Sequence, residues 1–274
     1  MRYVSRPGLL SVIFILSLPA LLWAGFSSKD LAAAERTMGS LLNVERGHTG
    51  LPALEYDELL AEVARAHSED MLKRHFFSHT NPDRESPGDR AVRRHPELVA
   101  RIGENIHHVM ITPGFELSQN MGLDQITQNG MASLMKSPPH RANILNTTYD
   151  HVGIGYAASE EEVYITQVFG EEVCILDSSP PRAWPRDSSL SIAGRILAAY
   201  PLNLLAAFLK VPDPNAAFDY GKGKQTVGGR FLKVETLTDR RFRFKAQLDA
   251  GPGDYQLMLG REERLIPGPI LRVK

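Results

Sequence analysis

A chain of 274 residues exceeds one average domain, so its length predicts two globular units. The 31 lysine and arginine residues balance 32 aspartate and glutamate residues, and the net charge of -1 excludes the basic surface that nucleic-acid-binding proteins use. The single cysteine, Cys174, excludes an intramolecular disulfide and a cysteine-rich zinc site, and its apolar neighbours predict a thiol buried in the core.

Residues 1–26 predict an export signal. Arg2 and Arg6 precede an apolar run of 18 residues, from 9 to 26, which is the order found in secretory signals. The run is also nearly long enough to remain as a single membrane anchor. Because Pro19 would disturb a spanning helix, we favour cleavage. We therefore expect a secreted or periplasmic protein that touches the membrane only if this segment is retained.

Two helices are expected next. Apolar residues recur at helical spacing over residues 29–46, and a second helical pattern covers residues 57–76, with Asp57 as a suitable N-cap. His67 lies on the apolar stripe of the second pattern. We expect it to be a buried imidazole of the core rather than a ligand.

The middle of the chain is less regular. Residues 81–101 are polar and contain proline, which predicts a loop with a short helix around residues 86–93. A further helix is expected over residues 123–135. Ser137 and Pro138 then predict a fresh helix start, with the serine side chain as the cap and the proline at the first position.

Two strands close this part of the chain. Residues 151–157 and 163–169 are separated by the acidic turn 159–162, which predicts an antiparallel hairpin. Helices combined with antiparallel strands make the fold class α+β.

The composition and the hydrophobic pattern of the sequence change beyond this hairpin. Residues 177–189 are rich in serine and proline and predict a linker. Alternating patterns over residues 231–236, 241–248 and 255–259 predict strands of a smaller all-β, immunoglobulin-like sandwich. Tyr255, close after a glycine-rich turn, is similar to the tyrosine corner of such domains.

The expected organisation therefore has four parts. They are a signal peptide or membrane anchor at 1–26, a first domain at 29–176, a linker at 177–189 and a β-sandwich domain at 190–274.

All nine histidines lie between residues 48 and 151, so we expect any chemistry in the first domain. Seven strings stand out there: LNVERGHTGLPAL at 42–54, AEVARAHSEDM at 61–71, HFFSH at 75–79, GENI at 103–106, SPPHRANIL at 137–145, HVGIGYA at 151–157 and VYITQVFG at 163–170. In this order they resemble bacterial domains of the CAP superfamily, the SCP-like domains of cysteine-rich secretory proteins, antigen 5 and pathogenesis-related proteins.

The resemblance implies an α-β-α sandwich with an open cleft, where two histidines and acidic residues can bind a divalent cation. His79, Glu104 and His140 match three members of that cluster. Ser137 stands where many eukaryotic members have a second glutamate. The resemblance also implies that Asn105 and Asn143, which lie in two of the strings, support the loops around the cleft.

Coordination chemistry agrees with this ligand set. Two neutral imidazoles and one carboxylate suit zinc or another divalent cation, with one position left for water or substrate. If His140 lies in the first turn of a helix, the helix dipole disfavours its charged form and keeps a nitrogen lone pair available.

Two functions stay open from the sequence. The first is a binding module, with a lipid, sterol or cell-wall fragment in the cleft and a protein partner on the β domain. The second is a metal-dependent hydrolase of peptide or cell-wall substrates, in which the cation activates water. No nucleophile and base stand in a recognisable pair, so we favour binding over an enzymatic activity.

Overall fold

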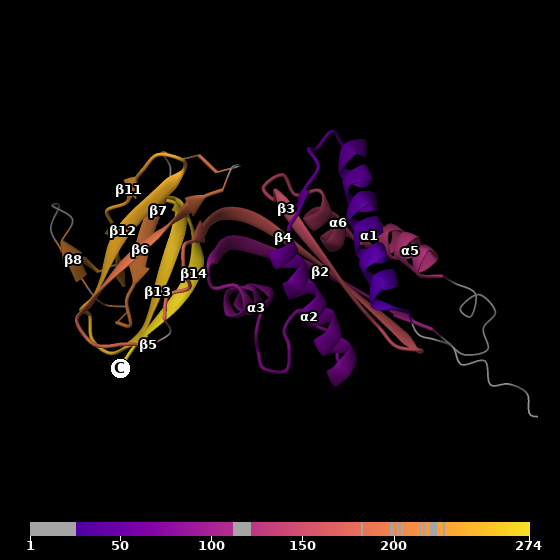
Figure 1. The fold of residues 1–274 in the computed structure, drawn as a ribbon, viewed down its shortest axis with the longest axis horizontal. Helices are drawn as coiled ribbons and strands as arrows, with labels where there is room; N and C mark the ends of the chain where they lie inside the picture. The colour runs from indigo at the N-terminus through magenta and orange to yellow at the C-terminus, as the bar shows by residue number, and fades with distance from the viewer. Residues whose placement is uncertain are drawn as a thin grey trace, which may run out of the picture.

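The computed structural model describes residues 26–111, 122–181, 183–197, 200, 201, 203, 205–213, 215, 217–219, 224–226 and 228–274. The predicted signal segment lies outside this range, except for its last residue. Within the described part of the chain, no helix is long and apolar enough to cross a membrane. Figure 1 shows two lobes side by side, a helical N-terminal lobe (α1 to β4) and a C-terminal β lobe (β5 to β14).

The helices of the N-terminal lobe are α1 (Ser28–His48), α2 (Glu58–Arg74), α3 (Pro87–Arg94), α5 (Leu123–Lys136) and α6 (Pro138–Ile144). Each lies close to a predicted helix. Asp57 is the N-cap of α2, as predicted, because its carboxylate accepts a hydrogen bond from the backbone N–H of Leu60. The helix ends two residues earlier than expected, since His75 adopts a left-handed backbone conformation with φ of 53°.

The strands of this lobe are β1 (Glu55–Tyr56), β2 (Leu98–Met110), β3 (His151–Ala158) and β4 (Glu162–Leu176). The predicted hairpin is confirmed, because β3 and β4 pair in antiparallel register. The loop prediction for residues 81–101 is wrong at its end, where β2 begins at Leu98 and pairs along β4. This strand carries the GENI string, so the expected site residue Glu104 lies on a strand.

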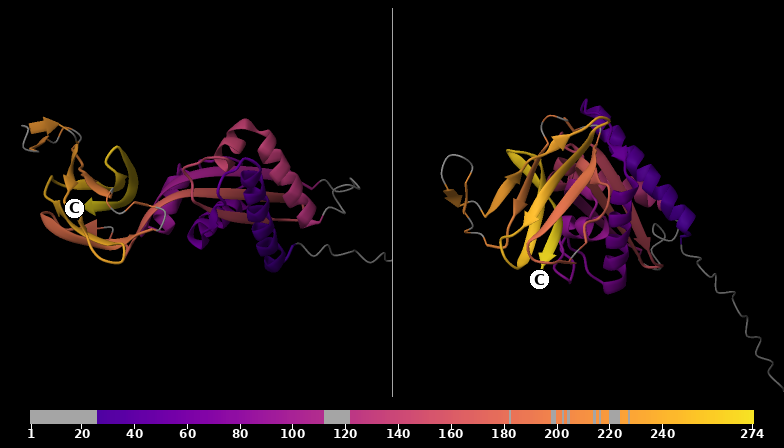
Figure 2. Two further views of the ribbon diagram at one scale, coloured as in Figure 1. Left: turned by 90° about the horizontal axis from the view of Figure 1, so that it is seen from above. Right: turned by 60° about the vertical axis from the view of Figure 1, so that its left-hand side comes forward.

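Helices cover both faces of this sheet (Figure 2). On one face α2 lies directly on β3, because a Cβ added to Gly153 or Gly155 would come within 2.0 or 2.1 Å of α2 backbone nitrogens. On the other face α1 and α5 share a core with the two hairpin strands that includes Met38, Ile126 and Ile154. The α+β class and the layering of helices on both sides of a sheet agree with expectation.

The β lobe consists of ten strands: β5 (Ala183–Trp184), β6 (Ser188–Ile196), β7 (Ala206–Lys210), β8 (Ala217–Asp219), β9 (Lys224–Thr226), β10 (Gly229–Leu232), β11 (Glu235–Thr236), β12 (Arg241–Leu248), β13 (Gly253–Arg261) and β14 (Arg264–Val273). One sheet has the order β10-β7-β13-β14-β5, and the facing strands β6, β12 and β11 continue the sheet of the N-terminal lobe through β4. The predicted strand 231–236 is in fact two short strands that belong to different sheets.

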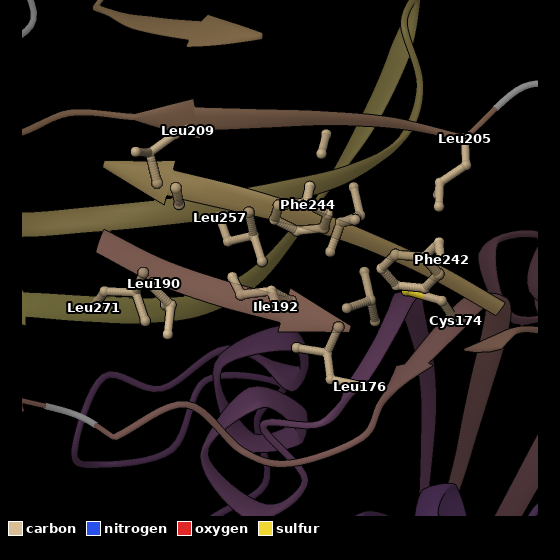
Figure 3. Packing of buried hydrophobic residues seen from close by; sticks show 14 of the residues in the cluster. Cys174, Leu176, Leu190, Ile192, Leu205, Leu209, Phe242, Phe244, Leu257 and Leu271 are labelled. Atoms are coloured by element: carbon tan, nitrogen blue, oxygen red, sulfur yellow. The ribbon is translucent and has the colours of Figure 1, made fainter. Parts of the chain in front are cut away.

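Figure 3 shows the apolar side chains between these sheets, among them Phe242, Phe244 and Leu257. The tyrosine expected at the corner is buried, and its hydroxyl donates to the carbonyl of Gly251 at 2.9 Å and accepts from the N–H of Ala250 at 2.7 Å. The second lobe is therefore a mostly β region with a packed core. Its immunoglobulin-like character stays a prediction.

The two lobes are connected by more than a linker. The predicted linker 177–189 contains β5, and β6 begins at Ser188. Cys174 and Leu176, at the end of β4, belong to the core of the β lobe, where Figure 3 shows them beside Phe242. The prediction of a buried thiol is confirmed, and burial raises the pKa of Cys174. The domain boundaries themselves stay a prediction.

Candidate functional site

Glu104 lies at the middle of β2 and faces α2. Its side chain is only 1% exposed, and both carboxylate oxygens have partners. Oε1 lies 2.8 Å from Nδ1 of His79, in the loop after α2, and Oε2 accepts a hydrogen bond of 2.6 Å from Arg90 of α3. The structure thus brings two of the three expected ligands, His79 and Glu104, into direct contact, and Glu104 also forms an ion pair with the buried Arg90.

Arg90 also fixes the loop that carries His79. Its other terminal nitrogen donates to the backbone carbonyls of His79 and Glu85, at 2.8 and 2.9 Å. Asn81 closes the same loop, because its side chain exchanges hydrogen bonds with the backbone and carboxylate of Glu85. The His79 ring, half exposed, is therefore held from behind by its own loop and by the carboxylate of Glu104.

His67 lies beneath this pair and is fully buried, as its place on the apolar stripe predicts. Its Nε2 donates to the carbonyl of Ser78 at 3.1 Å and lies 3.8 Å from the Glu104 carboxylate. Its Nδ1 has no hydrogen-bond partner among the described residues. Burial lowers the pKa of His67, and the nearby carboxylate opposes this. The ring is therefore neutral, and it packs behind the site rather than lining it.

The two asparagines of the family strings connect α6 to β2. Asn105 donates to the backbone carbonyl of His140 at 3.0 Å and to the side chain of Gln167. Asn143 donates to the backbone carbonyl of Glu104 at 3.1 Å and to the side chain of Asn105 at 2.9 Å. Because both bonds reach the strand that carries Glu104, they fix the position of the helix that carries His140.

His140 lies in the first turn of α6 and is partly buried. Burial lowers the pKa of His140, and a positive charge on His79 would lower it further. Burial also lowers the pKa of His107, on β2, with His140 as the next cause. The neutral form expected for His140 is supported, but burial rather than the helix dipole is its main cause.

Ser137 occupies the N-cap position of α6 and is followed by Pro138, as predicted. The predicted capping bond is wrong, because the serine side chain makes no cap hydrogen bond. The same residue also ends α5, so its backbone is already part of the preceding helix turn.

The fit of these side chains to a cation depends on which atoms are free. No group of three or more histidine, cysteine, aspartate or glutamate side chains in the described ranges is arranged to hold a metal ion. Glu104 is occupied by Arg90 and His79, whereas Nε2 of His79 and the ring of His140 are left for a ligand. A histidine held by a carboxylate is a common arrangement at metal sites, and Glu104 holds His79 in this way.

Sequence reasoning missed Arg90. It lies outside the seven strings, and its chemistry depends on contacts with residues 11 and 14 positions away. An arginine on a short polar helix resembles any solvated side chain, so the sequence carried no signal for its burial. His107 lies on β2, a strand that the sequence did not predict.

Comparison with known proteins identifies the first part of the chain. Residues 40–169 match the CAP family, described as the cysteine-rich secretory protein family. The uncharacterized protein YkwD of Bacillus subtilis (strain 168) is 33% identical over 130 residues, which are 47% of this chain and 45% of the relative. The chain thus covers less than half the length of this curated relative.

Two solved structures give a weaker likeness. An extracellular protein containing a SCP domain from Bacillus anthracis str. Ames is 26% identical, with a TM-score of 0.42 over 53% of this chain and 44% of that one. The crystal structure of NaASP2 with Zn²⁺ is 14% identical, with a TM-score of 0.34 over 54% of this chain and 82% of that one. Neither bears on the chemistry of this chain. From the family match and the sequence relative, residues 40–169 form a CAP domain of the cysteine-rich secretory protein family.

Proposed function

We propose that this chain is an exported binding protein whose CAP domain holds a ligand, together with a divalent cation, beside His79 and His140. The export proposal depends on residues 1–26, with their two arginines and apolar run. The ligand classes implied by the family resemblance are a lipid, a sterol or a cell-wall fragment. We further propose that the β lobe contacts a protein partner, since it exposes Phe231 and Ile270.

The observation that supports binding over hydrolysis is the state of Glu104. A hydrolytic metal site needs a carboxylate or another base that can take a proton from the bound water. The carboxylate of Glu104 is instead tied to Arg90 at 2.6 Å and to His79 at 2.8 Å. Ser137, where another acid would stand, carries only a hydroxyl. Among the described residues, the site therefore has ligand nitrogens, and both oxygens of its carboxylate already have partners.

The cation proposal depends on the two imidazoles. A hydrogen bond from Nδ1 of His79 to Glu104 leaves the lone pair of Nε2 free, and the lowered pKa of His140 keeps that ring neutral. Neutral imidazole nitrogen suits zinc, which would supply a positive charge that polarises a bound oxygen. Glu104 would act from behind by orienting His79.

The test is a zinc titration of the purified chain by calorimetry. We expect one zinc ion per chain in the wild type and no measurable binding in the His79→Ala/His140→Ala variant. Glu104→Gln should weaken binding about 10–100-fold, because it removes the charge that orients His79. His48→Ala is the matched control, since this histidine is exposed at the end of α1 and should leave binding unchanged. Equal binding by the double variant would contradict the cation site.

The second arm measures turnover. The zinc-loaded chain is incubated with peptide, ester and peptidoglycan substrates beside the double variant. We expect no release above that of the variant, because a general base of the kind that contributes about 10²–10⁴-fold is missing. Turnover that is robust in the wild type and lost in the double variant would replace binding with metal-dependent hydrolysis as the function.

A further inference from the structure

A second cavity lies between the two lobes, away from His79 and His140. Its volume is about 840 Å³, which is within the range of small-molecule sites. The CAP domain supplies residues 147–151 and the side chains of Glu55 and Glu171, and the β lobe supplies Tyr200, Arg261, Glu263 and Arg264. Figure 1 shows β14 of the β lobe beside the end of the CAP domain where β2 and β4 bend toward it. A ligand here would touch both lobes.

The wall from the CAP domain is rich in carboxylates. Glu55 and Asp150 line the cavity beside His151, whose Nδ1 lies 2.8 Å from Asp150 and whose Nε2 lies 3.7 Å from Glu55. Behind them lies Glu172, 3% exposed, with Oε2 3.6 Å from His151. Oε1 of Glu172 has no hydrogen-bond partner in the described structure. The wall therefore carries more negative charge than the single imidazole can balance.

The pKa shifts of Glu172 and His151 reflect the same excess of carboxylates over positive charge. Burial, followed by the carboxylate of Asp57 at the start of α2, raises the pKa of Glu172 to about 7; His151 opposes the shift, and Asp150 and Glu55 add to it. Burial opposes the charge of His151, but Asp150 and Glu172 outweigh it and raise the pKa of His151. A cation bound at this wall would relieve the repulsion among the carboxylates.

The wall from the β lobe offers an unused polar group. Tyr200 is 6% exposed and lines the cavity, and its hydroxyl has no hydrogen-bond partner among the residues that the structure describes. The guanidinium of Arg261 lies over the ring of this tyrosine, 5.8 Å from its centre. A buried hydroxyl without a partner is costly, so a ligand that accepts or donates a hydrogen bond there would gain affinity.

We propose that this cavity binds a ligand with a primary ammonium group on a flexible aliphatic stem, as in a lysine-containing peptide. The ammonium group is placed beside Glu55 and Asp150, and a polar group of the same ligand reaches the hydroxyl of Tyr200. The site is separate from the one proposed beside His79 and His140, and either can fail without the other.

The test is calorimetric titration of the full chain with the peptide Gly-Lys-Gly, blocked at both ends so that the lysine carries the only amine. The matched control peptide has norleucine in place of lysine, which keeps the stem and removes the charge. We expect the norleucine peptide to bind about tenfold more weakly or worse. Equal binding of the two peptides, or no binding of the lysine peptide at millimolar concentration, would overturn the proposal.

Two variants locate the site. Glu55→Gln removes a charge from an exposed side chain that lies 3.7 Å from His151, so it should weaken lysine-peptide binding about threefold without affecting the fold. Tyr200→Phe removes only the hydroxyl and should weaken it about fivefold. Glu235→Gln, a matched glutamate change on the exposed strand β11, should leave binding unchanged. If the Glu235→Gln control lost as much affinity as the two variants, the peptide would not bind in this cavity.

The pH dependence gives an independent readout. Glu172, with a pKa of about 7, is mostly protonated at pH 6 and mostly ionised at pH 8, so the wall is more negative at pH 8 and the lysine peptide should bind about threefold tighter there than at pH 6. Glu172→Gln should reduce this difference. Butylamine is titrated in parallel as a free amine, and competition between butylamine and the lysine peptide supports the ammonium site. A lysine peptide that binds more tightly at pH 6 would contradict it.

Discussion

Glu104 and Arg90 show how one buried charge determines the chemistry of the candidate site. A carboxylate that is 1% exposed is costly unless a positive group and further hydrogen bonds compensate it. Arg90 supplies the charge, and its other terminal nitrogen donates to two backbone carbonyls. The ion pair with Arg90 therefore stabilises the buried carboxylate of Glu104 and also restricts the use of this carboxylate as a base.

Removing Arg90 should be strongly destabilising. We expect Arg90→Met to lower the free energy of unfolding by about 3–5 kcal/mol, because it leaves the charge of Glu104 buried without its partner. The double variant Arg90→Met/Glu104→Gln should recover part of this loss, since it removes the buried charge as well. Urea denaturation followed by circular dichroism measures both.

Arg94→Met is the control for this experiment. Arg94 pairs with Glu62 at 3.3 Å on the surface, where both side chains are about two-fifths exposed. Its loss should cost less than about 1 kcal/mol. Equal destabilisation by the two arginine variants would mean that the buried pair has no special role.

The family strings were sufficient to predict that His79 and Glu104 lie together, because the fold that family members share brings these positions into one site. Arg90 could not be found in this way. Its role depends on the path of the loop after α2, which brings α3 against β2, and no local pattern encodes that contact. The same limit applies to Tyr200, whose environment is formed by both lobes.

At the scale of elements, the packing of α2 on β3 depends on two glycines without side chains. A Cβ on Gly155 would lie 2.1 Å from the backbone nitrogen of Arg65, and backbone cannot move aside as a flexible side chain can. We expect Gly155→Ala to destabilise the protein by about 1–3 kcal/mol or more, since α2 must shift away from the sheet. Thermal denaturation of the purified variant measures this.

Gly47→Ala is the matched control. This glycine lies near the end of α1, and an added Cβ would meet nothing within 4 Å. Alanine should therefore stabilise the helix by about 0.5–1 kcal/mol, the usual difference between these residues in a helix. A similar loss of stability in both variants would contradict the close approach of α2 to β3.

Helices were easier to predict than strands in this chain. Each helix buries one face, so apolar spacing of 3.6 residues is visible in the sequence. β2 is different, because it carries Glu104, Asn105 and two histidines that find partners only in the folded protein. β14 was missed because Pro267 and Pro269 indicate a turn, whereas the structure accommodates them beside a register shift between β13 and β14.

At the scale of the whole molecule, β4 is the feature that joins the lobes. Its first residues pair with β3, and its last three pair with β6 of the β lobe. Val99 from β2 and Val173 from β4 also belong to the core of the β lobe. The two lobes therefore share a sheet and part of a core, and a ligand between them would be held by two surfaces with a fixed relation.

This continuity predicts the result of limited proteolysis. Asp177, Ser178 and Ser179 are exposed and lie outside helices and strands, so a protease of broad specificity should cut first within residues 177–181. The two fragments should nevertheless elute together from a sizing column under native conditions, because the paired strands β4 and β6 and the shared core hold them. They should separate only in denaturant. A first cut elsewhere would argue against the predicted boundary at 177, and fragments that separate without denaturant would mean that the shared strand contributes little to the association of the lobes.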